Sequence, residues 1–341
     1  MIEKNNLKRS ITQREIARLL NLSTATVSLA LSNSEKVNLE TKKRVWEVAE
    51  MLNYTPSEIA RSLVLQKTQS IGLIVPDFSV TYFNEFMEKI QNKLKEKNYL
   101  TITLSANISE RKEAIKVLLK RRVDGLILPF INIDELYWLQ QNSIPFVLYD
   151  RIEGVDNVDY VYVNKFNGGY KATEHLIKTG YRKIGFLCAR DEERTKGYIE
   201  AIIDYGLKIN KEWIIPGLGF FEGGYKGAKE ILKKREKPEA LVCLNDISAI
   251  GAIKAFYEED IKVPDDIAIV GFDNIKEGRY FIPSLTTVEQ PVEEIADEIV
   301  KILIEKIEKG SKEVQRKVIE PKLIIRESCG CKKKEVVEKN K

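Results

Sequence analysis

From Ser70 onward, short apolar runs alternate with longer amphipathic stretches, and this rhythm constrains the fold more than any other feature. The first run, SIGLIVPD, is almost continuously apolar and stops at Pro76-Asp77, which is typical of a buried parallel strand. Similar runs lie at 100–106, 123–130, 145–150, 183–189, 240–246 and 267–273. Helical patterns lie at 82–97, 109–121, 168–179, 192–205, 223–235, 247–259 and 291–309. Repeated strand–helix–strand units predict open parallel sheets with helices on both faces.

The first 56 residues have a different pattern, which predicts three short helices. Thr12 is a candidate N-cap with Glu15 three residues later, as in a capping box. The apolar spacing breaks at Asn21, and Ser23 can cap a second helix. A third helix is expected over 39–51, and a short hinge helix after Pro56, which suits a first turn.

The first helix pair has the features of a helix-turn-helix. Ala17 is small enough for close helix contact, and Asn21 tolerates a left-handed turn. Val27 would face the first helix, so the second would expose Thr24, Ala25, Ser28 and Leu29 to the major groove. Taken alone, this pattern fits an ordinary helical hairpin equally well.

The charge distribution favours the DNA-binding interpretation. Residues 1–67 contain 11 Lys and Arg against 7 Asp and Glu, whereas the remaining 274 residues contain 44 of each. The excess positive charge therefore lies in the first fifth of the chain. That distribution is expected of a module that meets phosphates.

Composition excludes several other classes. The hydrophobic fraction of 43% is enough for packed cores, and no apolar run is long enough to cross a membrane. The N-terminus lacks a secretion signal, which predicts a cytoplasmic protein.

Of four cysteines, Cys188 and Cys243 lie in apolar segments, and the pair Cys329 and Cys331 is too small for a metal site by itself.

The single histidine, His175, is expected to be structural, because no catalytic partner pattern accompanies it. No cofactor is expected either: Gly217-Leu218-Gly219 misses the dinucleotide-binding spacing, and no phosphate-binding P-loop occurs. An enzyme is therefore disfavoured. A secreted sugar-transport protein would need a signal sequence, which this sequence lacks. It would have no use for a basic headpiece, so this class of protein fits the sequence no better than an enzyme does.

Blocks along most of the chain resemble the LacI/GalR family of bacterial repressors. The N-terminal blocks are ITQREIARLLNLSTATVSLALS, TKKRVWEVAEMLNYTPSEIARSL and SIGLIVPD. Later blocks are YDRI at 149–152, GGYKATEHLIKTGYRKIGFL at 168–187, RTKGY at 194–198, LNDISAIGAI at 244–253, IVGFDNIKEGRYFIPSLTTVEQP at 269–291 and IIRES at 324–328. Their order and spacing match the family, which is far more specific than any one motif.

The resemblance implies a helix-turn-helix headpiece over 1–56, a hinge over 57–67 and a two-lobed core over 68–330 like that of periplasmic binding proteins. The tail over 331–341 is expected to be disordered. One lobe would comprise 68–164 with 287–318, and the other 165–286 with 319–330. It also implies a homodimer on pseudo-palindromic, double-stranded operator DNA. The family's tetramer-forming leucine tail is not evident, which favours a dimer.

The resemblance also assigns DNA contacts. Thr24 and Ala25 are expected at base edges, and Ser28 and Tyr54 at phosphates. Leu29 stands where most relatives have an arginine that can hydrogen-bond guanine, so an unusual operator is expected, unless Leu29 merely packs. Leu63, in ARSL, is expected to wedge into the minor groove at the operator centre.

A small-molecule effector is expected between the lobes. The matching positions are Tyr82, Phe83, Asp150, Arg151, Arg194, Asn245, Asp246 and Asp273. The resemblance favours a sugar over a purine, because sugars are the commoner effectors in the family. As physical support, Arg and Asp can bracket vicinal hydroxyls, while aromatic rings suit a sugar or a base, so a purine remains possible. Asp246 could instead cap a helix. Gly219 departs from the family's aromatic, for which Phe220 or Phe221 could substitute. Whether the effector induces or corepresses is left open.

Overall fold

The computed structural model describes residues 11–54, 67–129, 131–152, 154–155, 157–190 and 192–331. The chain divides into two compact units, Met1–Thr68 and Gln69–Lys341, which we call the headpiece and the core. The expected hinge helix with Leu63 and the tail after Cys331 lie outside the described residues.

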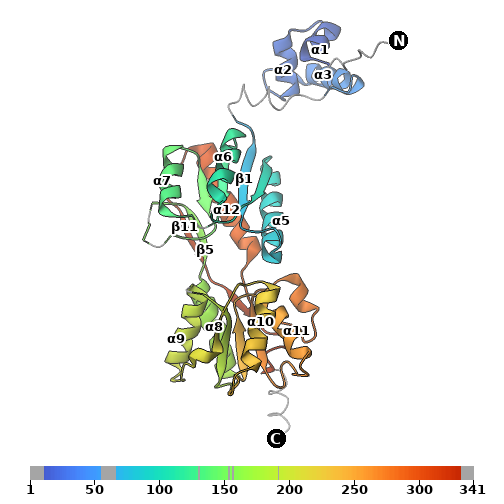
Figure 1. The fold of residues 1–341 in the computed structure, drawn as a ribbon. Coiled ribbons are helices and arrows are strands. Elements are labelled where there is room, and N and C mark those ends of the chain that lie inside the picture. Colours follow the sequence, from blue (N-terminus) through green and yellow to red (C-terminus); the bar gives the residue numbers. More distant parts are fainter. Residues whose placement is uncertain are drawn as a thin grey trace, which may run out of the picture. The chain divides into compact units, whose positions relative to one another are not determined.

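The described residues of the headpiece form three helices, α1 (Gln13–Leu20), α2 (Thr24–Leu31) and α3 (Leu39–Met51) (Figure 1). The predicted caps are confirmed. Thr12 and Glu15 form a capping box, and the Ser23 hydroxyl accepts a hydrogen bond from the Thr26 amide at 3.0 Å. Asn21 ends α1 with φ 54°, in the left-handed region that a tight turn between helices requires. Local sequence therefore sets both ends of α1 and the start of α2.

A small apolar core holds the three helices together. Its fully or almost fully buried members are Ile16, Ala17, Val27, Ala30, Leu31, Val37, Val45 and Ala49. Ala17 and Val27 lie where the first two helices meet, as the spacing predicts. A larger side chain at Ala17 would push α2 away from α1, because close-packed interiors leave no room for added atoms.

The first sheet of the core has six parallel strands in the order β11-β5-β4-β3-β1-β2. The strands are β1 (Ser70–Val75), β2 (Leu100–Ser105), β3 (Gly125–Leu128), β4 (Phe146–Leu148), β5 (Tyr160–Val163) and β11 (Arg316–Ile319). The helices on this sheet are α5 (Thr81–Glu96), α6 (Arg111–Lys120), α7 (Ile133–Gln141) and α12 (Val292–Lys309).

Alternation along β1 shows why both faces of this sheet are covered. Ile71, Leu73 and Val75 pack with apolar residues of α5 and α12, whereas Ile74 packs with α6 and α7 on the opposite face. A strand buried on both faces must be apolar at every position, which explains the continuous run from which it was predicted.

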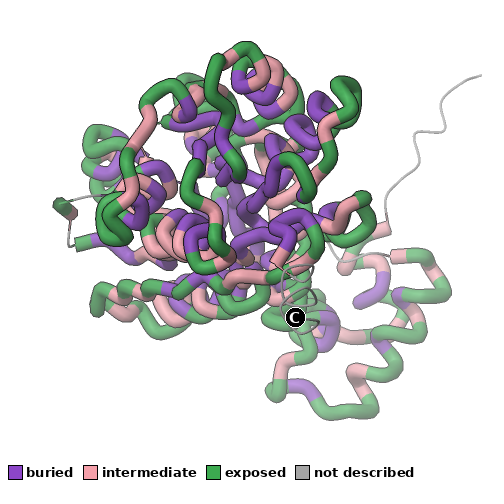
Figure 2. Tube along the Cα trace, turned by 90° about the horizontal axis from the view of Figure 1, so that it is seen from below, coloured by how far each residue is buried: buried purple, intermediate pink, exposed green. Residues whose placement is uncertain are grey.

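The second sheet follows the order β12-β10-β9-β8-β6-β7, and only β12 is antiparallel to its neighbour. The strands are β6 (Ile184–Ala189), β7 (Ile214–Pro216), β8 (Ala240–Cys243), β9 (Ala268–Asp273), β10 (Thr286–Glu289) and β12 (Lys322–Ile324). The helices are α8 (Lys165–Lys178), α9 (Glu193–Asp204), α10 (Phe221–Leu232) and α11 (Asp246–Tyr257), with short 3-10 helices η1 (Lys211–Trp213) and η2 (Lys276–Arg279). Figure 2 shows the buried segments of the core running through its centre, with the exposed turns outside.

The expected two-lobed parallel architecture is confirmed, with one corrected boundary. We expected residues 287–318 in the first lobe, but β10 pairs with β9 and belongs to the second sheet. The chain crosses between the lobes at 163–165, 289–292 and 319–322. The expectation failed because the TTVE segment is short and carries no apolar run that would mark it as a strand. In the part of the chain that the structure describes, no helix is long and apolar enough to span a membrane.

Candidate functional site

A cavity of about 380 Å³ lies in the core and is lined by residues of both lobes. From the first lobe come Pro76, Val80, Tyr82, Phe83, Ala106, Ile108, Arg111, Pro129, Tyr149 and Asp150. From the second lobe and a crossover come Lys165, Arg190, Glu192, Arg194, Gly219, Phe220, Leu244, Asn245, Asp273 and Gln290. Most of these residues follow the carboxyl ends of parallel strands, where ligands bind in open α/β sheets.

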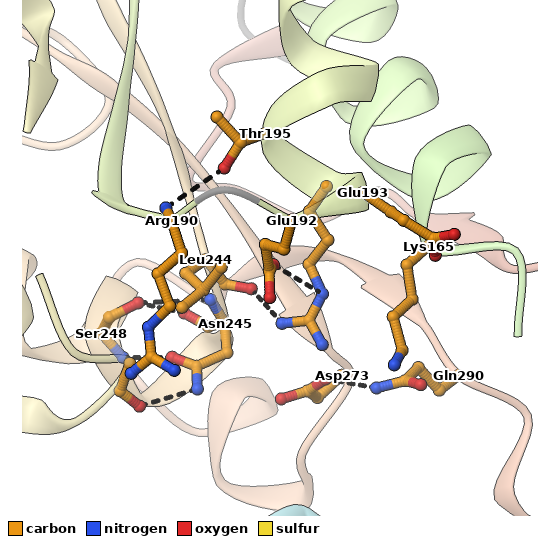
Figure 3. Close-up of polar contacts among 12 residues, drawn as sticks. Lys165, Arg190, Glu192, Glu193, Thr195, Leu244, Asn245, Ser248, Asp273 and Gln290 are labelled. Carbon is orange, nitrogen blue, oxygen red and sulfur yellow. Dashed lines mark hydrogen bonds and ion pairs between the residues drawn. The ribbon is translucent and has the colours of Figure 1, made fainter. Parts of the chain in front are cut away.

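Asp273 ends β9 at the cavity, where Gln290 contacts it (Figure 3). It ends β9 with φ 110°, and Asn274 follows with φ 57°, so two consecutive residues occupy conformations that favour glycine. Gln290, on the crossover that follows β10, donates a hydrogen bond from Nε2 to Asp273 Oδ1 at 2.6 Å. Strained backbone of this kind persists only when its surroundings fix it, and such positions cluster at functional sites.

Burial changes the acidity of this carboxyl group. Asp273 is only 8% exposed, and desolvation raises its pKa to about 6, although Arg194 and the Gln290 hydrogen bond act in the opposite direction. The group is therefore ionised at neutral pH but can titrate in mildly acidic solution. An ionised carboxylate accepts hydrogen bonds from hydroxyl or amino groups of a ligand.

Arg194 lies in the first turn of α9 and reaches the same cavity. Its guanidinium donates from Nη1 to the Leu244 carbonyl at 2.6 Å and lies 4.4 Å from the centre of the Phe272 ring. Its Nε lies 3.7 Å from Glu192 Oε1, which is a long ion pair (Figure 3). Packing on the Phe272 ring and the hydrogen bond to a carbonyl hold the Arg194 side chain in place. Its guanidinium still carries a positive charge that can bind a ligand.

Two glycines set the position of Arg194. The helices α8 and α9 approach so closely that a Cβ on Gly169 would lie 2.1 Å from the Arg194 carbonyl oxygen. A Cβ on Gly197 would lie 2.0 Å from the Phe166 carbonyl oxygen. Any other residue at either position would force the helices apart and move Arg194 away from the cavity. Close approach of α8 and α9 therefore requires a glycine in both blocks, Gly169 in GGY and Gly197 in RTKGY.

Asn245 builds a second wall of the cavity from the start of α11. Its Oδ1 accepts from the Ser248 amide at 3.0 Å, which caps the helix, and its Nδ2 donates to the Gly219 carbonyl at 2.7 Å (Figure 3). A Cβ on Gly219 would lie 2.9 Å from Asn245 Nδ2, so the glycine permits this contact. Asn245 therefore holds the loop that carries Phe220 into the cavity.

The first lobe supplies an aromatic wall. Tyr82 and Phe83 lie in the first turn of α5 with ring centres 5.3 Å apart, and Phe86 and Tyr149 pack behind them. The Tyr149 hydroxyl donates to the Ile74 carbonyl at 2.8 Å. Burial raises the pKa of both Tyr82 and Tyr149 far above the usual tyrosine value, so both hydroxyls stay protonated and can donate.

An ion pair joins the two lobes beside this wall. Lys165, at the start of α8, donates from Nζ to Asp150 Oδ2 at 2.6 Å. Arg111 lies under the cavity in a buried pair with Glu135. Cationic groups, carboxylates and aromatic rings are thus mixed around one small volume.

The structure brings most of the predicted effector residues together. Those that line the cavity are Tyr82, Phe83, Asp150, Arg194, Asn245 and Asp273. Arg151 and Asp246 do not line it. Arg151 packs on the Tyr162 ring and pairs with Glu193 at 2.5 Å.

Asp246 is completely buried next to the cavity wall rather than in it. It accepts hydrogen bonds from the Thr287 hydroxyl at 2.6 Å and the Ile275 amide at 2.9 Å. It does not cap α11 either, because Asn245 is the N-cap. Burial and the nearby Asp273 raise its pKa well above the usual value. Its hydrogen bonds fasten β10 and the loop after β9, and so support the conformation of Asp273.

Sequence reasoning missed several lining residues, among them Arg111, Tyr149, Lys165, Arg190, Glu192 and Gln290. Tyr149 adjoins the predicted Asp150, and Arg190 follows the predicted strand end, so position at a strand's carboxyl end was an available signal. Arg190 reaches the cavity through an irregularity at Cys188, which has φ 60° and shifts the register of β6 and β7. No local pattern predicts such a bulge. Of the two phenylalanines expected to replace the aromatic at Gly219, Phe220 lines the cavity.

On the headpiece, the expected reading face of α2 is open to solvent. Thr24, Ala25, Ser28 and Leu29 are exposed, whereas Tyr54 is half-buried against the headpiece core. Leu29 is 36% exposed and, among the described residues of the headpiece, is not one of those that form or pack against that core.

Comparisons with known proteins match both units. Residues 12–57 match the model of bacterial regulatory proteins of the lacI family, and residues 173–329 match the periplasmic binding protein-like domain. A solved CelR–cellobiose complex is 25% identical with a TM-score of 0.71, covering 93% of this chain and 99% of that one. A LacI family regulator from Enterococcus faecium with bound ribose is 28% identical with a TM-score of 0.70, covering 76% and 98%.

A curated relative extends the likeness over nearly the whole chain. The HTH-type transcriptional repressor PurR of Photorhabdus laumondii is 35% identical over 328 residues, which are 93% of this chain and 96% of the relative. Together with the two family matches and the fold, this likeness identifies the chain as a member of the lacI family of bacterial transcription regulators, which are not enzymes.

Proposed function

We propose that this lacI-family repressor binds a sugar in the cavity between its lobes and that the sugar changes its affinity for operator DNA. The observation that carries the proposal is the pairing of an aromatic wall on one lobe with Asp273 and Arg194 on the other. A sugar presents an apolar ring face and a rim of vicinal hydroxyls. Aromatic rings pack on the first, and charged donors and acceptors bind the second.

The size of the cavity and the solved relatives support a sugar. A volume of about 380 Å³ lies near the lower end of the range for small-molecule sites and suits one or two sugar rings. Relatives with the same core fold hold cellobiose and ribose. A purine is the second candidate, because Tyr82, Phe83 and Phe220 could stack on a planar base and Asp273 could accept from its N–H groups.

The contacts across the cavity suggest how binding is transmitted. Lys165 with Asp150, and Glu193 with Arg151 and Tyr162, join the lobes beside the crossovers. A ligand that contacts both lobes stabilises the relative orientation of the lobes in which its contacts with each lobe can form together. In a homodimer, the orientation of the lobes sets the spacing of the two headpieces on a two-fold symmetric operator. The ligand then changes operator affinity by its difference in affinity for the two arrangements.

The test uses the full chain and an operator selected from random duplexes. Thermal denaturation is measured with a panel of mono- and disaccharides and of purines, and operator affinity is then measured with each stabilising compound. We expect a sugar to raise the melting temperature and to change operator affinity by about 5- to 150-fold. Stabilisation by purines alone would overturn the sugar assignment. A stabilising sugar that leaves operator affinity unchanged would overturn the switch, and failure to enrich any duplex would overturn operator binding.

Leu29 offers a test of the proposed reading face. The variant Leu29→Ala should lose about tenfold or more in affinity for the selected operator, because three carbon atoms lose an apolar contact with DNA. Affinity for a scrambled duplex, which depends on phosphates, should stay the same. Leu39, an exposed leucine at the start of α3, provides the matched control Leu39→Ala, which should leave both affinities unchanged. Equal losses on both duplexes would show that Leu29 reads no base.

A further inference from the structure

His175, Cys329 and Cys331 lie together in the second lobe. The two sulfur atoms are 3.3 Å apart, and they and one ring nitrogen of His175 all lie within 4.8 Å of one another. His175 belongs to the last turns of α8, 154 positions before Cys329 in the chain. Neither the sequence pattern nor the effector cavity accounts for this cluster.

We propose that His175, Cys329 and Cys331 form a binding site for one thiophilic metal ion, Zn²⁺ being the ion that two thiolates and an imidazole suit best. Two sulfurs and one nitrogen are a common donor set for zinc with three protein ligands, and the fourth position is then taken by water. Bond lengths of about 2.3 Å to sulfur and 2.0 Å to nitrogen place tetrahedral donors about 3.5 to 4 Å apart. The observed separations need only small side-chain adjustments to reach these values.

The turn that carries both cysteines is built for their close approach. Gly330 has φ 72°, and a Cβ there would lie 2.9 Å from the Tyr181 hydroxyl, so both the backbone and the surroundings require glycine. The Gly330 amide donates to the Glu327 carbonyl at 3.0 Å, and the Tyr181 hydroxyl donates to the Cys329 carbonyl at 3.2 Å. Ser328 fixes the turn to the sheet, since its hydroxyl donates to the Ile269 carbonyl at 2.7 Å. A rigid turn of this kind holds two donors ready for one ion.

His175 supplies the observation that points to a ligand. Its Nε2 atom is buried and has no hydrogen-bond partner among the residues that the structure describes. A buried nitrogen without a partner costs free energy, and coordination of a metal ion would remove that cost. His175 is also the only histidine in the chain.

The surroundings of the cluster allow an ion to enter and to be held. Cys329 is fully buried in the core of the second lobe, while His175 and Cys331 are half-buried, so the cluster reaches the surface on one side. Metal binds to thiolates, and thiols that are still protonated release their protons to the solvent on binding.

The cluster is separate from the effector cavity. The cavity lies at the carboxyl ends of β6, β8 and β9, where Arg190, Asn245 and Asp273 are found. The cysteine turn is bonded to Ile269, near the start of β9, and thus to the opposite end of the sheet. Metal binding is therefore expected to stabilise the second lobe. Substitutions that abolish effector binding in the cavity should leave metal binding unchanged.

The test uses the full chain, stripped of metal and kept reduced with a phosphine that binds no metal. Titration with Co²⁺ should give one equivalent of a tetrahedral complex, with visible d–d bands and a near-ultraviolet sulfur-to-cobalt band, and Zn²⁺ should displace it. Zn²⁺ should also raise the melting temperature. Cys331→Ser, at a half-buried position, should lose the sulfur band in part and bind Co²⁺ more than about 100-fold more weakly, because a direct ligand matters more than its outer-shell partners.

Cys243→Ala is the matched control, since it removes another buried thiol of the same lobe and should leave the cobalt spectrum unchanged. Circular dichroism of Cys331→Ser confirms that the variant is folded. His175→Gln should weaken Co²⁺ binding while both thiolate contributions remain. An unaltered cobalt spectrum in Cys331→Ser, or the absence of a stoichiometric sulfur band in the parent protein, would overturn the site. So would rapid formation of a Cys329–Cys331 disulfide that Zn²⁺ does not slow.

Discussion

Asp273→Asn is expected to lower the affinity for effector by about 10- to 100-fold, because a hydrogen bond to a charged acceptor is replaced by one to a neutral amide. The side chain keeps its size, and its carbonyl oxygen can still accept the hydrogen bond from Gln290. The loss is measured by calorimetric titration with the sugar that the thermal screen identifies. Arg194→Ala is expected to have an effect of at least the same size. Affinity for the selected operator without effector should persist in both variants.

Two controls separate a local effect from damage to the fold. Arg235→Ala removes an exposed arginine of the same lobe that does not line the cavity, and it should bind effector like the parent protein. Asp273→Asn should not destabilise the core at pH 7.5. The pKa of Asp273 in the folded protein, about 6, lies above its usual value of 3.8. Burial of the ionised carboxylate therefore lowers the free energy of unfolding as pH rises from 3.8 through about 6. Unchanged effector affinity in both Asp273→Asn and Arg194→Ala would refute the assignment of the cavity.

The same carboxyl group predicts a pH dependence. Above pH 7 Asp273 is ionised and effector affinity should be constant, whereas below about pH 6 the affinity should fall by up to tenfold per pH unit. The cause is that the protonated carboxyl group is a weaker acceptor, and it must lose its proton before it can accept charge-assisted hydrogen bonds from the hydroxyl groups of the ligand. Asp273→Asn should show no such fall between pH 7.5 and 5. A parent profile that stays flat over this range would show that the ionised form is not the binding form.

Glu135→Ala is expected to reduce the free energy of unfolding of the core by about 3 to 5 kcal/mol, because it leaves Arg111 buried without its counter-ion. The two side chains are only 4% and 6% exposed, and Arg111 donates from Nε at 3.2 Å and from Nη2 at 2.5 Å. Glu135 also accepts from the Asn132 amide at 3.0 Å and so completes the cap of α7. Urea unfolding followed by circular dichroism measures the loss.

A second pair in the same lobe provides the comparison. Glu113 pairs with Lys116 at 2.6 Å on the surface of α6, and Glu113→Ala should leave the urea unfolding curve almost unchanged. Replacing both buried partners, as in R111M/E135L, should cost less than Glu135→Ala alone, because no unpaired charge remains. If Glu135→Ala and Glu113→Ala had equal effects, the buried pair would not stabilise the lobe as argued.

The sequence alone determined the headpiece and the class of the core. Thr12, Glu15, Asn21 and Ser23 act within one or two turns of chain, so their caps and the tight turn could be read directly. Strands that are buried on both faces are apolar at almost every position, and this pattern predicted β1, β6 and β9. The short strands β5, β7, β10, β11 and β12 were not predicted, because segments of three or four residues at or next to a sheet edge carry too little pattern.

Tertiary structure decided which side chains share a cavity and which share a metal-binding geometry. Asp246 and Asp273 both follow strand ends, yet hydrogen bonds from Ile275 and Thr287 bury the first, while Gln290 holds the second at the cavity. His175 meets the cysteine turn only because α8 and the last residues of the second lobe pack in one core. Such meetings depend on contacts between distant segments, and local sequence carries no record of them.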